Sequence, residues 1–315
     1  MSEAWNEYWS GAANPAAADA VRGCAPGAGL SQFWRARFSA LFEDGAPRRL
    51  VDLAGGGGAV AREAALAAHE RGAPIEIVCL DVSPAAAASA ADAVEAPASA
   101  VVGDAARLPL ALRAFDVVTS QYGVEYAGRT AVEEAGRLVA PGGACIVLAH
   151  LDGGAIQAEC RANAAVLSAL VESGLFAKAQ ALFDALARPD AVGSVEDQAY
   201  RAALQICAEA ASAYSGPAAD HAARLSQDIA TLLQRRAAYH PRDAAAWLDG
   251  QAAAAAAYLE RMRDMVRAAL SKADVDAVAA EWTKAGLRVA KVEPISMERG
   301  GSPCAWRLEA RGPGA

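Results

Sequence analysis

The sequence predicts an α/β fold in which a mostly parallel sheet is interrupted by a large helical insertion. From residue 49 onward, short apolar runs alternate with helical stretches or loops, a pattern typical of buried strands in a parallel sheet. Between residues 153 and 271 the strand pattern disappears, and apolar residues recur at helical spacing. We therefore expect an N-terminal helical cap over 1–45, a core over 46–152, a helical insertion over 153–271, and a segment over 272–315 that completes the core.

Five short apolar runs are the expected strands of the core: Leu50–Leu53, Ile75–Leu80, Ala100–Val102, Phe115–Thr119 and Cys145–Ala149. After the insertion, Val275–Ala285 predicts a helix that stops at Gly286, because glycine commonly ends helices. Leu287–Val292 and Cys304–Leu308 are the two remaining strands that we expect.

The longest helix expected in the insertion carries a narrow apolar seam. Its residues follow one another at alternating steps of four and three: Leu248, Ala252, Ala255, Leu259, Met262 and Val266. Such a seam packs against another helix, and the partner helix lies either within the insertion or across a homodimer.

Composition and charge restrict the class of protein. Hydrophobic residues make up 54% of the chain and charged residues 21%, which fits a folded domain. The net charge of −8 argues against a nucleic-acid partner, and the opening residues do not predict a secretory signal. The longest alanine run, Ala252–Ala257, is far shorter than a membrane span. The cysteines and histidines lack metal-ligand spacing. We expect a cytoplasmic protein with no membrane partner and no bound metal.

A glycine-rich turn follows the first expected strand, in the run Val51-Asp52-Leu53-Ala54-Gly55-Gly56-Gly57-Gly58. Glycines let backbone amides approach a ligand closely, and the start of the next helix favours negative charge. Asp81 closes the second strand, where a carboxylate can accept hydrogen bonds from both ribose hydroxyls. These features fit NAD or another nucleoside cofactor. The alternatives are that the glycines form only a tight turn and that Asp81 caps the next helix.

Three further motifs follow in order. The third strand ends in Val101-Val102-Gly103-Asp104-Ala105, the fourth in Ser120-Gln121-Tyr122-Gly123-Val124-Glu125-Tyr126, and the fifth is preceded by Arg137-Leu138-Val139-Ala140-Pro141-Gly142-Gly143. Together with the glycine turn and Asp81, this series resembles that of class I S-adenosylmethionine-dependent methyltransferases. The resemblance runs from Arg49 to His150 and extends to the final strand pair. It departs at Ala54, where the family more often has glycine. The opening Trp5-Asn6-Glu7-Tyr8-Trp9 is similar to that of bacterial methyltransferase-domain proteins.

This resemblance implies a Rossmann-like sheet of seven strands with an antiparallel last strand, and a site for S-adenosylmethionine at its carboxyl edge. The implied cofactor-binding residues lie in four groups. They are Asp52, Ala54, Gly55, Gly56 and Gly58 for the methionine portion; Asp81 and Val82 for the ribose; Asp104 and Ala105 for the adenine; and Ser120 and Gln121 at the end of strand four.

Catalytic candidates lie where the fourth and fifth strands end. Methyl transfer is an in-line displacement, and some acceptors must also lose a proton. An imidazole suits general-base work, so His150 is the candidate base, and a core or surface histidine bonded to backbone is its alternative. Glu125 could orient an acceptor or face solvent. Tyr122, like Tyr126 and the two N-terminal tryptophans, could flank the sulfonium by cation–π contact, although the tryptophans could equally pack a helix.

We therefore predict methyl transfer from S-adenosylmethionine to an N or O atom of a small-molecule acceptor, leaving S-adenosylhomocysteine. The N-terminal helices and the insertion are expected to roof the site. An NAD-linked oxidoreductase is one alternative, although Asp104 has no role in it and no Tyr-x-x-x-Lys set is present. A non-catalytic S-adenosylmethionine-binding protein that acts through its helical region is the other.

Overall fold

The computed structural model describes residues 3–11, 27–187, 192–296 and 300–314 of the chain. It divides into two compact units, Met1–Ala158 with Asp264–Ala315, and Glu159–Arg263. The first unit contains the sheet and the helices that cover it. All regular structure described in the second unit is helical.

A seven-stranded sheet forms the centre of the first unit, with the strand order β3-β2-β1-β4-β5-β7-β6. The strands are β1 (Arg48–Leu53), β2 (Ile75–Asp81), β3 (Ala98–Val102), β4 (Phe115–Gln121), β5 (Val139–His150), β6 (Arg288–Ile295) and β7 (Ala305–Arg311). Strands β1 to β5 pair in parallel, whereas β7 is antiparallel to both β5 and β6. This topology confirms the predicted fold. The strand order reverses at β1 and β4, and ligands of open α/β sheets bind at the carboxyl ends of such strands.

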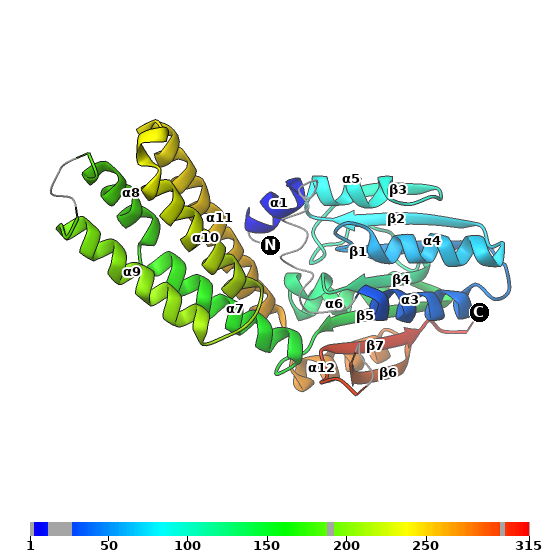
Figure 1. Ribbon diagram of the computed structural model, residues 1–315. Helices are drawn as coiled ribbons and strands as arrows, with labels where there is room; N and C mark the ends of the chain where they lie inside the picture. Colours follow the sequence, from blue (N-terminus) through cyan, green and yellow to red (C-terminus); the bar gives the residue numbers. More distant parts are fainter. Residues whose placement is uncertain (1–2, 12–26, 188–191, 297–299, 315) are drawn as a thin grey trace. The chain divides into compact units, whose positions relative to one another are not determined.

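Helices cover both faces of this sheet (Figure 1). On one face, α3 (Gly27–Leu41) and α4 (Ala59–Arg71) share a buried core with Leu50, Ile77 and Val117. On the other face, α6 (Arg129–Arg137) and α12 (Lys272–Lys284) share a core with Val51, Val78 and Val118. Neighbouring residues of one strand thus face opposite layers, as the two-residue period of a strand requires. The unit also contains α1 (Glu3–Ser10), α5 (Pro84–Asp92) and η2 (Val124–Ala127).

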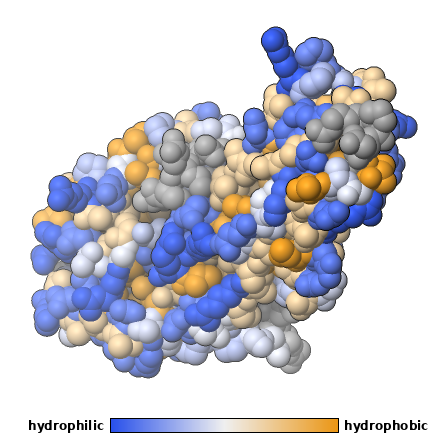
Figure 2. Space-filling view, turned by 90° about the vertical axis from the view of Figure 1, so that its left-hand side faces the viewer, coloured by the Kyte–Doolittle hydropathy of each residue, from blue (hydrophilic) through white to orange (hydrophobic). Residues whose placement is uncertain are grey.

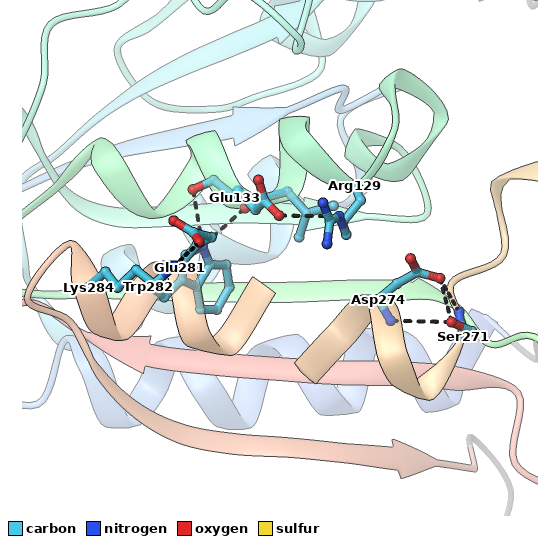
Figure 3. A network of polar contacts seen from close by, with 8 residues as sticks. Arg129, Glu133, Ser271, Asp274, Glu281, Trp282 and Lys284 are labelled. Carbon is cyan, nitrogen blue, oxygen red and sulfur yellow. Dashed lines mark hydrogen bonds and ion pairs between the residues drawn. The ribbon is translucent and has the colours of Figure 1, made fainter. Parts of the chain in front are cut away.

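Trp282 joins α12 to α6. Its indole nitrogen donates to the carbonyl oxygens of Val132 at 3.1 Å and Glu133 at 3.2 Å (Figure 3). A Cβ at Gly136 would lie 2.6 Å from the indole ring, so the close packing of these helices requires glycine there. Ser271 and Asp274 form a capping box at the start of α12, which satisfies the first amides of the helix.

The second unit is built from α7 (Ala155–Glu172), α8 (Leu175–Ala185), α9 (Val195–Ser212), α10 (Pro217–Gln234), η3 (Arg236–Ala238) and α11 (Pro241–Ala268). Leu248, Leu259 and Met262 of the predicted seam on α11 are each less than 5% exposed in this single chain. These three residues therefore pack within the chain, as one of the two alternatives for the seam expects, and the homodimer stays a prediction.

One stretch of the described chain, Ala155–Ala185, is long and apolar enough to cross a membrane by length and composition alone. The structure breaks it into α7 and α8 at Gly174, which has a left-handed backbone. Leu167, Leu170 and Phe183 from the two helices are fully buried. These apolar residues belong to the core of the helical unit, and hydrophilic and hydrophobic residues are interleaved on the face seen in Figure 2.

Candidate active site

The glycine loop between β1 and α4 is held by Asp81 at the end of β2. The Gly56 amide donates to Asp81 Oδ2 at 3.1 Å, and the Ser83 amide donates to Oδ1 at 2.9 Å. Gly58 precedes α4 with φ of 74°, and a Cβ there would lie 2.8 Å from Ala90 Cα. Only glycine therefore permits this close approach of the loop to α5. These contacts hold the loop in place at the carboxyl edge of the sheet.

Two non-glycine residues with left-handed backbone follow β1 and β4. Ala54 and Tyr122 both have φ of 51°. A Cβ at Gly123 would lie 2.4 Å from the Ala54 carbonyl oxygen, so the two strand ends are in contact. Left-handed backbone costs about 1–2 kcal/mol for a residue with a Cβ and often marks a functional site. This penalty explains why a glycine is common at the position of Ala54.

A cavity of about 300 Å³ opens beside these strand ends. Its lining residues come from the loop after β1, the end of β2 and the residue after it, the loop after β3, and the segment after β4: Ala54, Leu80, Val82, Gly103, Asp104, Ala105, Ala106, Gly123, Tyr126 and Ala127. The carboxylate of Asp104 is exposed, and its Oδ1 accepts the Ala106 amide at 2.9 Å. The cavity thus combines an apolar wall with one carboxylate, a suitable lining for a flat ring that carries an amine.

A second cavity of about 40 Å³ shares Ala54, Gly123 and Tyr126 with the first. Its other lining residues are Gly56, Asp81, Tyr122 and, from α1, Trp5 and Trp9. The two cavities are therefore adjacent, and the smaller one lies between the glycine loop and the aromatic residues of α1.

Asp52 lies beneath this loop and is fully buried. Thr119 Oγ1 donates to its Oδ1 at 3.1 Å, whereas Oδ2 accepts no hydrogen bond from any described residue. Burial raises the pKa of Asp52 to about 7, and the nearby charge of Asp81 adds to this effect. The pKa of Asp81 is also raised by its burial, against the opposing effect of the backbone amides that it accepts. A cationic ligand would favour the charged form of both carboxylates.

His150 and Glu125 form a buried pair at the ends of β5 and of the segment after β4. Glu125 Oε1 accepts the His150 backbone amide at 3.0 Å and lies 2.7 Å from its Nδ1. The His150 ring also contacts the rings of Tyr122 and Tyr126, at centroid distances of 4.7 Å and 5.6 Å. Glu125 is only 2% exposed, so the alternative that it faces solvent is wrong. His150 lines neither cavity, but both tyrosines that it contacts line the smaller one.

Residues 51–147 match the family model described as a methyltransferase domain. This part of the chain is therefore similar to methyltransferase domains.

The chain is also similar to a curated protein, the ubiquinone/menaquinone biosynthesis C-methyltransferase of Dinoroseobacter shibae. The two are 34% identical over 127 residues, which cover 38% of this chain and 49% of that protein. The chain thus spans about half the length of the curated relative that it matches.

Solved structures of S-adenosylmethionine-dependent methyltransferases from Mesorhizobium loti and Aquifex aeolicus are also similar. The first is 14% identical with a TM-score of 0.43 and covers 88% of this chain and 96% of its own. The second is 9% identical with a TM-score of 0.39 and covers 84% and 81%.

The cofactor of such a methyltransferase domain is S-adenosylmethionine, and the residues present fit it. Asp104 offers an acceptor for the adenine amine, and the larger cavity has room for a nucleoside ring. Asp81 borders the smaller cavity, and the unpartnered Oδ2 of Asp52 lies below the loop. S-adenosylmethionine is cationic at sulfur, and these buried carboxylates suit a cation.

Of the predicted cofactor-binding residues, Ser120 and Gln121 have other partners in the structure. Ser120 Oγ accepts the Val124 amide at 3.1 Å and so begins the η2 turn. Gln121 Oε1 accepts the Trp34 indole N–H at 2.6 Å. Neither residue lines the larger or the smaller of these two cavities. Their cofactor contacts, like those of the other predicted site residues, stay predictions.

Three residues that line the larger cavity are not among the predicted site residues: Gly103, Gly123 and Ala127. Gly103 carries a usable signal, because a glycine before an acid at a strand end indicates a close backbone approach. A Cβ there would lie 3.0 Å from the Pro109 ring. Ala127 belongs to η2, and nothing in the sequence pattern indicates that this turn folds back over the cavity.

Proposed function

We propose that this chain transfers a methyl group from S-adenosylmethionine to an N or O atom of a small-molecule acceptor. One observation carries the proposal: two cavities at the carboxyl edge share three lining residues, and the buried His150–Glu125 pair contacts two tyrosines that line the smaller one. A nucleoside site that adjoins a potential base is the arrangement that methyl transfer to a protonated atom requires.

Each part of the cavities has a role in binding. The carboxylate of Asp104 accepts the adenine amine, and Val82 and Ala105 pack against the ring. Asp81 accepts the ribose hydroxyls while it continues to hold the Gly56 amide. S-adenosylmethionine supplies the electrophilic methyl group when bound, and Tyr122 and Tyr126 border the space beside the glycine loop.

His150 is the proposed base, and Glu125 is the residue that positions it. With Nδ1 protonated and donating to Glu125, His150 keeps Nε2 free of that bond as a proton acceptor. Glu125 also accepts the backbone amide of His150, so the carboxylate fixes the ring and the strand end together. The rings of Tyr122 and Tyr126 exclude water from the pair, because His150 is only 1% exposed.

Transfer to carbon is the second candidate, since the curated relative is named a C-methyltransferase. A base is useful in this case too, because removing a hydroxyl proton from an aromatic acceptor makes its ring carbons more nucleophilic. The two candidates differ in the linkage of the product and require the same cofactor site.

The proposal includes a cytoplasmic enzyme without a nucleic-acid or membrane partner, and a homodimer through the helical insertion. All of the five described cysteines are buried, and none of them forms a disulfide, which supports a reducing compartment: Cys79, Cys145, Cys160, Cys207 and Cys304.

Two measurements test this function. A thermal-shift assay with S-adenosylmethionine, S-adenosylhomocysteine and NAD identifies the cofactor, because a ligand that binds the native state raises the melting temperature. Stabilisation by NAD alone contradicts the proposal. Methyl-labelled S-adenosylmethionine is then supplied with the small-molecule and macromolecular fractions of a bacterial extract. We expect label in small molecules, and mass spectrometry separates N- and O-linked from C-linked methyl groups. Binding without turnover would favour the non-catalytic alternative.

A further inference from the structure

Helix α1 places an aromatic surface over the glycine loop. A Cβ at Gly56 would lie 2.6 Å from the Trp9 ring, so the indole rests directly on this glycine. Trp5 meets Tyr126 edge to face at a centroid distance of 5.4 Å, and Tyr8 packs between the two tryptophans at 5.8 Å and 4.9 Å. The position of α1 is therefore set by contacts with the two segments that form the site.

Four aromatic residues from these elements line the smaller cavity. Trp5 and Trp9 come from α1, Tyr122 follows β4, and Tyr126 lies in η2. Among the described residues that line the cavity, Asp81 alone has a charged side chain. Aromatic faces together with a carboxylate favour an organic cation, because the faces of aromatic rings carry negative potential.

Trp5 adds an independent indication of a ligand. Its side chain is only 7% exposed, and its indole N–H has no hydrogen-bond partner among the described residues. A buried donor without a partner is unfavourable and is rare in folded proteins. An acceptor supplied by a ligand in the cavity would satisfy this N–H.

We propose that α1 is a cofactor clamp, in which Trp5 and Trp9 recognise the positively charged sulfonium of S-adenosylmethionine and bind the neutral product less tightly. This inference rests on the proposed function, because it needs that cofactor in the larger cavity. Methyl transfer removes the charge at sulfur, so the clamp loses its cation–π contact when the reaction is complete. Product release is thereby favoured over cofactor release.

The size of the smaller cavity requires α1 to move during binding. About 40 Å³ holds only a few water-sized groups, which is less than the methionine portion of the cofactor occupies. Trp9 must therefore leave Gly56 as the cofactor enters, and α1 then closes on the charged ligand. Amide hydrogen exchange in residues 3–10 should slow when S-adenosylmethionine is added and change less with S-adenosylhomocysteine.

Calorimetry with three ligands tests the role of charge. They are S-adenosylmethionine, S-adenosylhomocysteine, and an analogue in which a protonated amine replaces the sulfonium. We expect Trp5→Leu and Trp9→Leu to weaken binding of the two charged ligands about tenfold and of the neutral one less than about threefold. Trp5→Phe keeps a ring but removes the N–H, so it separates ring contact from hydrogen bonding. Trp247→Leu is the matched control, since it removes an indole of the helical unit that lines neither cavity.

An equal loss of affinity for charged and neutral ligands would overturn the recognition of charge, as would no loss in either tryptophan variant. Failure of the proposed function gives a different result, because the wild-type protein would then bind none of the three ligands. Melting temperatures of all variants are measured in parallel, so that a folding defect is not read as a loss of affinity.

Discussion

Asp274 and Asp52 are the same residue type in two regions that surround it in opposite ways. At the start of α12, Asp274 accepts the Ser271 hydroxyl and amide, and these hydrogen bonds lower the pKa of its carboxyl. At the end of β1, Asp52 has one oxygen without a described partner, and burial raises its pKa to about 7. The first carboxylate stabilises a helix, and the second is held in an unfavourable environment.

This contrast extends to the residues around each aspartate. The region where α6 meets α12 has a capping box and a buried indole with hydrogen-bonded N–H. The carboxyl edge has two left-handed non-glycine residues and an unpartnered indole N–H. Strain and unpaired polar groups that collect at one edge indicate selection for binding rather than for stability. Substitutions in the two regions should therefore have opposite effects on stability.

The largest effect should come from Trp282 in the supporting region. Trp282→Ala removes a fully buried indole and leaves two carbonyls without its N–H, so we expect a loss of about 3–5 kcal/mol in the free energy of unfolding. Urea denaturation measures it. The control is Trp247→Ala, whose indole is only partly buried, and it should cost clearly less. If both variants lose the same free energy of unfolding, the α6–α12 contact stabilises the protein no more than a partly buried tryptophan does.

Asp52→Asn should raise the free energy of unfolding, whereas Trp282→Ala lowers it. A raised carboxyl pKa means that the folded protein holds a proton which the unfolded chain has released, so stability falls as pH rises from about 4 to about 7. Asparagine has no such titration. The variant should therefore exceed the wild type by roughly 2–4 kcal/mol at pH 8, at about 1.4 kcal/mol per pKa unit, and the difference should shrink toward pH 4.

Two comparisons check this result by denaturation across pH. Asp52→Asn should also bind S-adenosylmethionine more weakly, since it removes a carboxylate near a cation. Asp274→Asn should lose stability at pH 7, because a lowered carboxyl pKa contributes stability that is present above the unfolded pKa and lost as pH falls. If Asp52→Asn is less stable than wild type at pH 8, the buried carboxylate of Asp52 does not destabilise the folded protein.

The His150–Glu125 pair should control turnover. His150→Ala should lower turnover about 100-fold and leave cofactor affinity nearly unchanged, as expected for a group that acts mainly in the transition state. Glu125→Gln should lower turnover less. If Glu125 acts through His150, the double variant should be no slower than His150→Ala alone. If His150 is purely structural, His150→Ala should lose stability but keep full activity per folded molecule. Tyr122 would then be the next catalytic candidate to test.

Much of the fold could be predicted because buried parallel strands have a local signature. Every predicted strand is present within a few residues, apart from the start of β5. That strand begins at Val139 instead of the predicted Cys145 and includes the Pro141-Gly142-Gly143 run. A proline–glycine run normally indicates a turn, but here a Cβ at Gly143 would lie 2.8 Å from the Asp116 carbonyl oxygen. The glycine is needed for close approach of a neighbouring strand, and local pattern cannot distinguish the two uses.

The candidate site was less predictable, because its contacts join distant parts of the chain. Trp34 reaches Gln121 across 87 residues, and Glu125 reaches His150 across 25. Motif order indicated which residues gather at the carboxyl edge, since parallel strands end together. It did not indicate which side chain would accept from which donor, because that depends on packing against α3 and η2.

Ala54→Gly should have the smallest effect and still distinguish strain from ordinary packing. Glycine adopts φ of 51° without the Cβ penalty, but it gains freedom in the unfolded chain, so the net gain in stability should be about 0.5 kcal/mol. The matched control is Ala59→Gly at the exposed start of α4, where the same change should cost roughly 0.5–1 kcal/mol. Chemical denaturation of both variants measures the difference. If both substitutions destabilise equally, the backbone at Ala54 stores no strain, and its methyl group is a packing contact against Gly123.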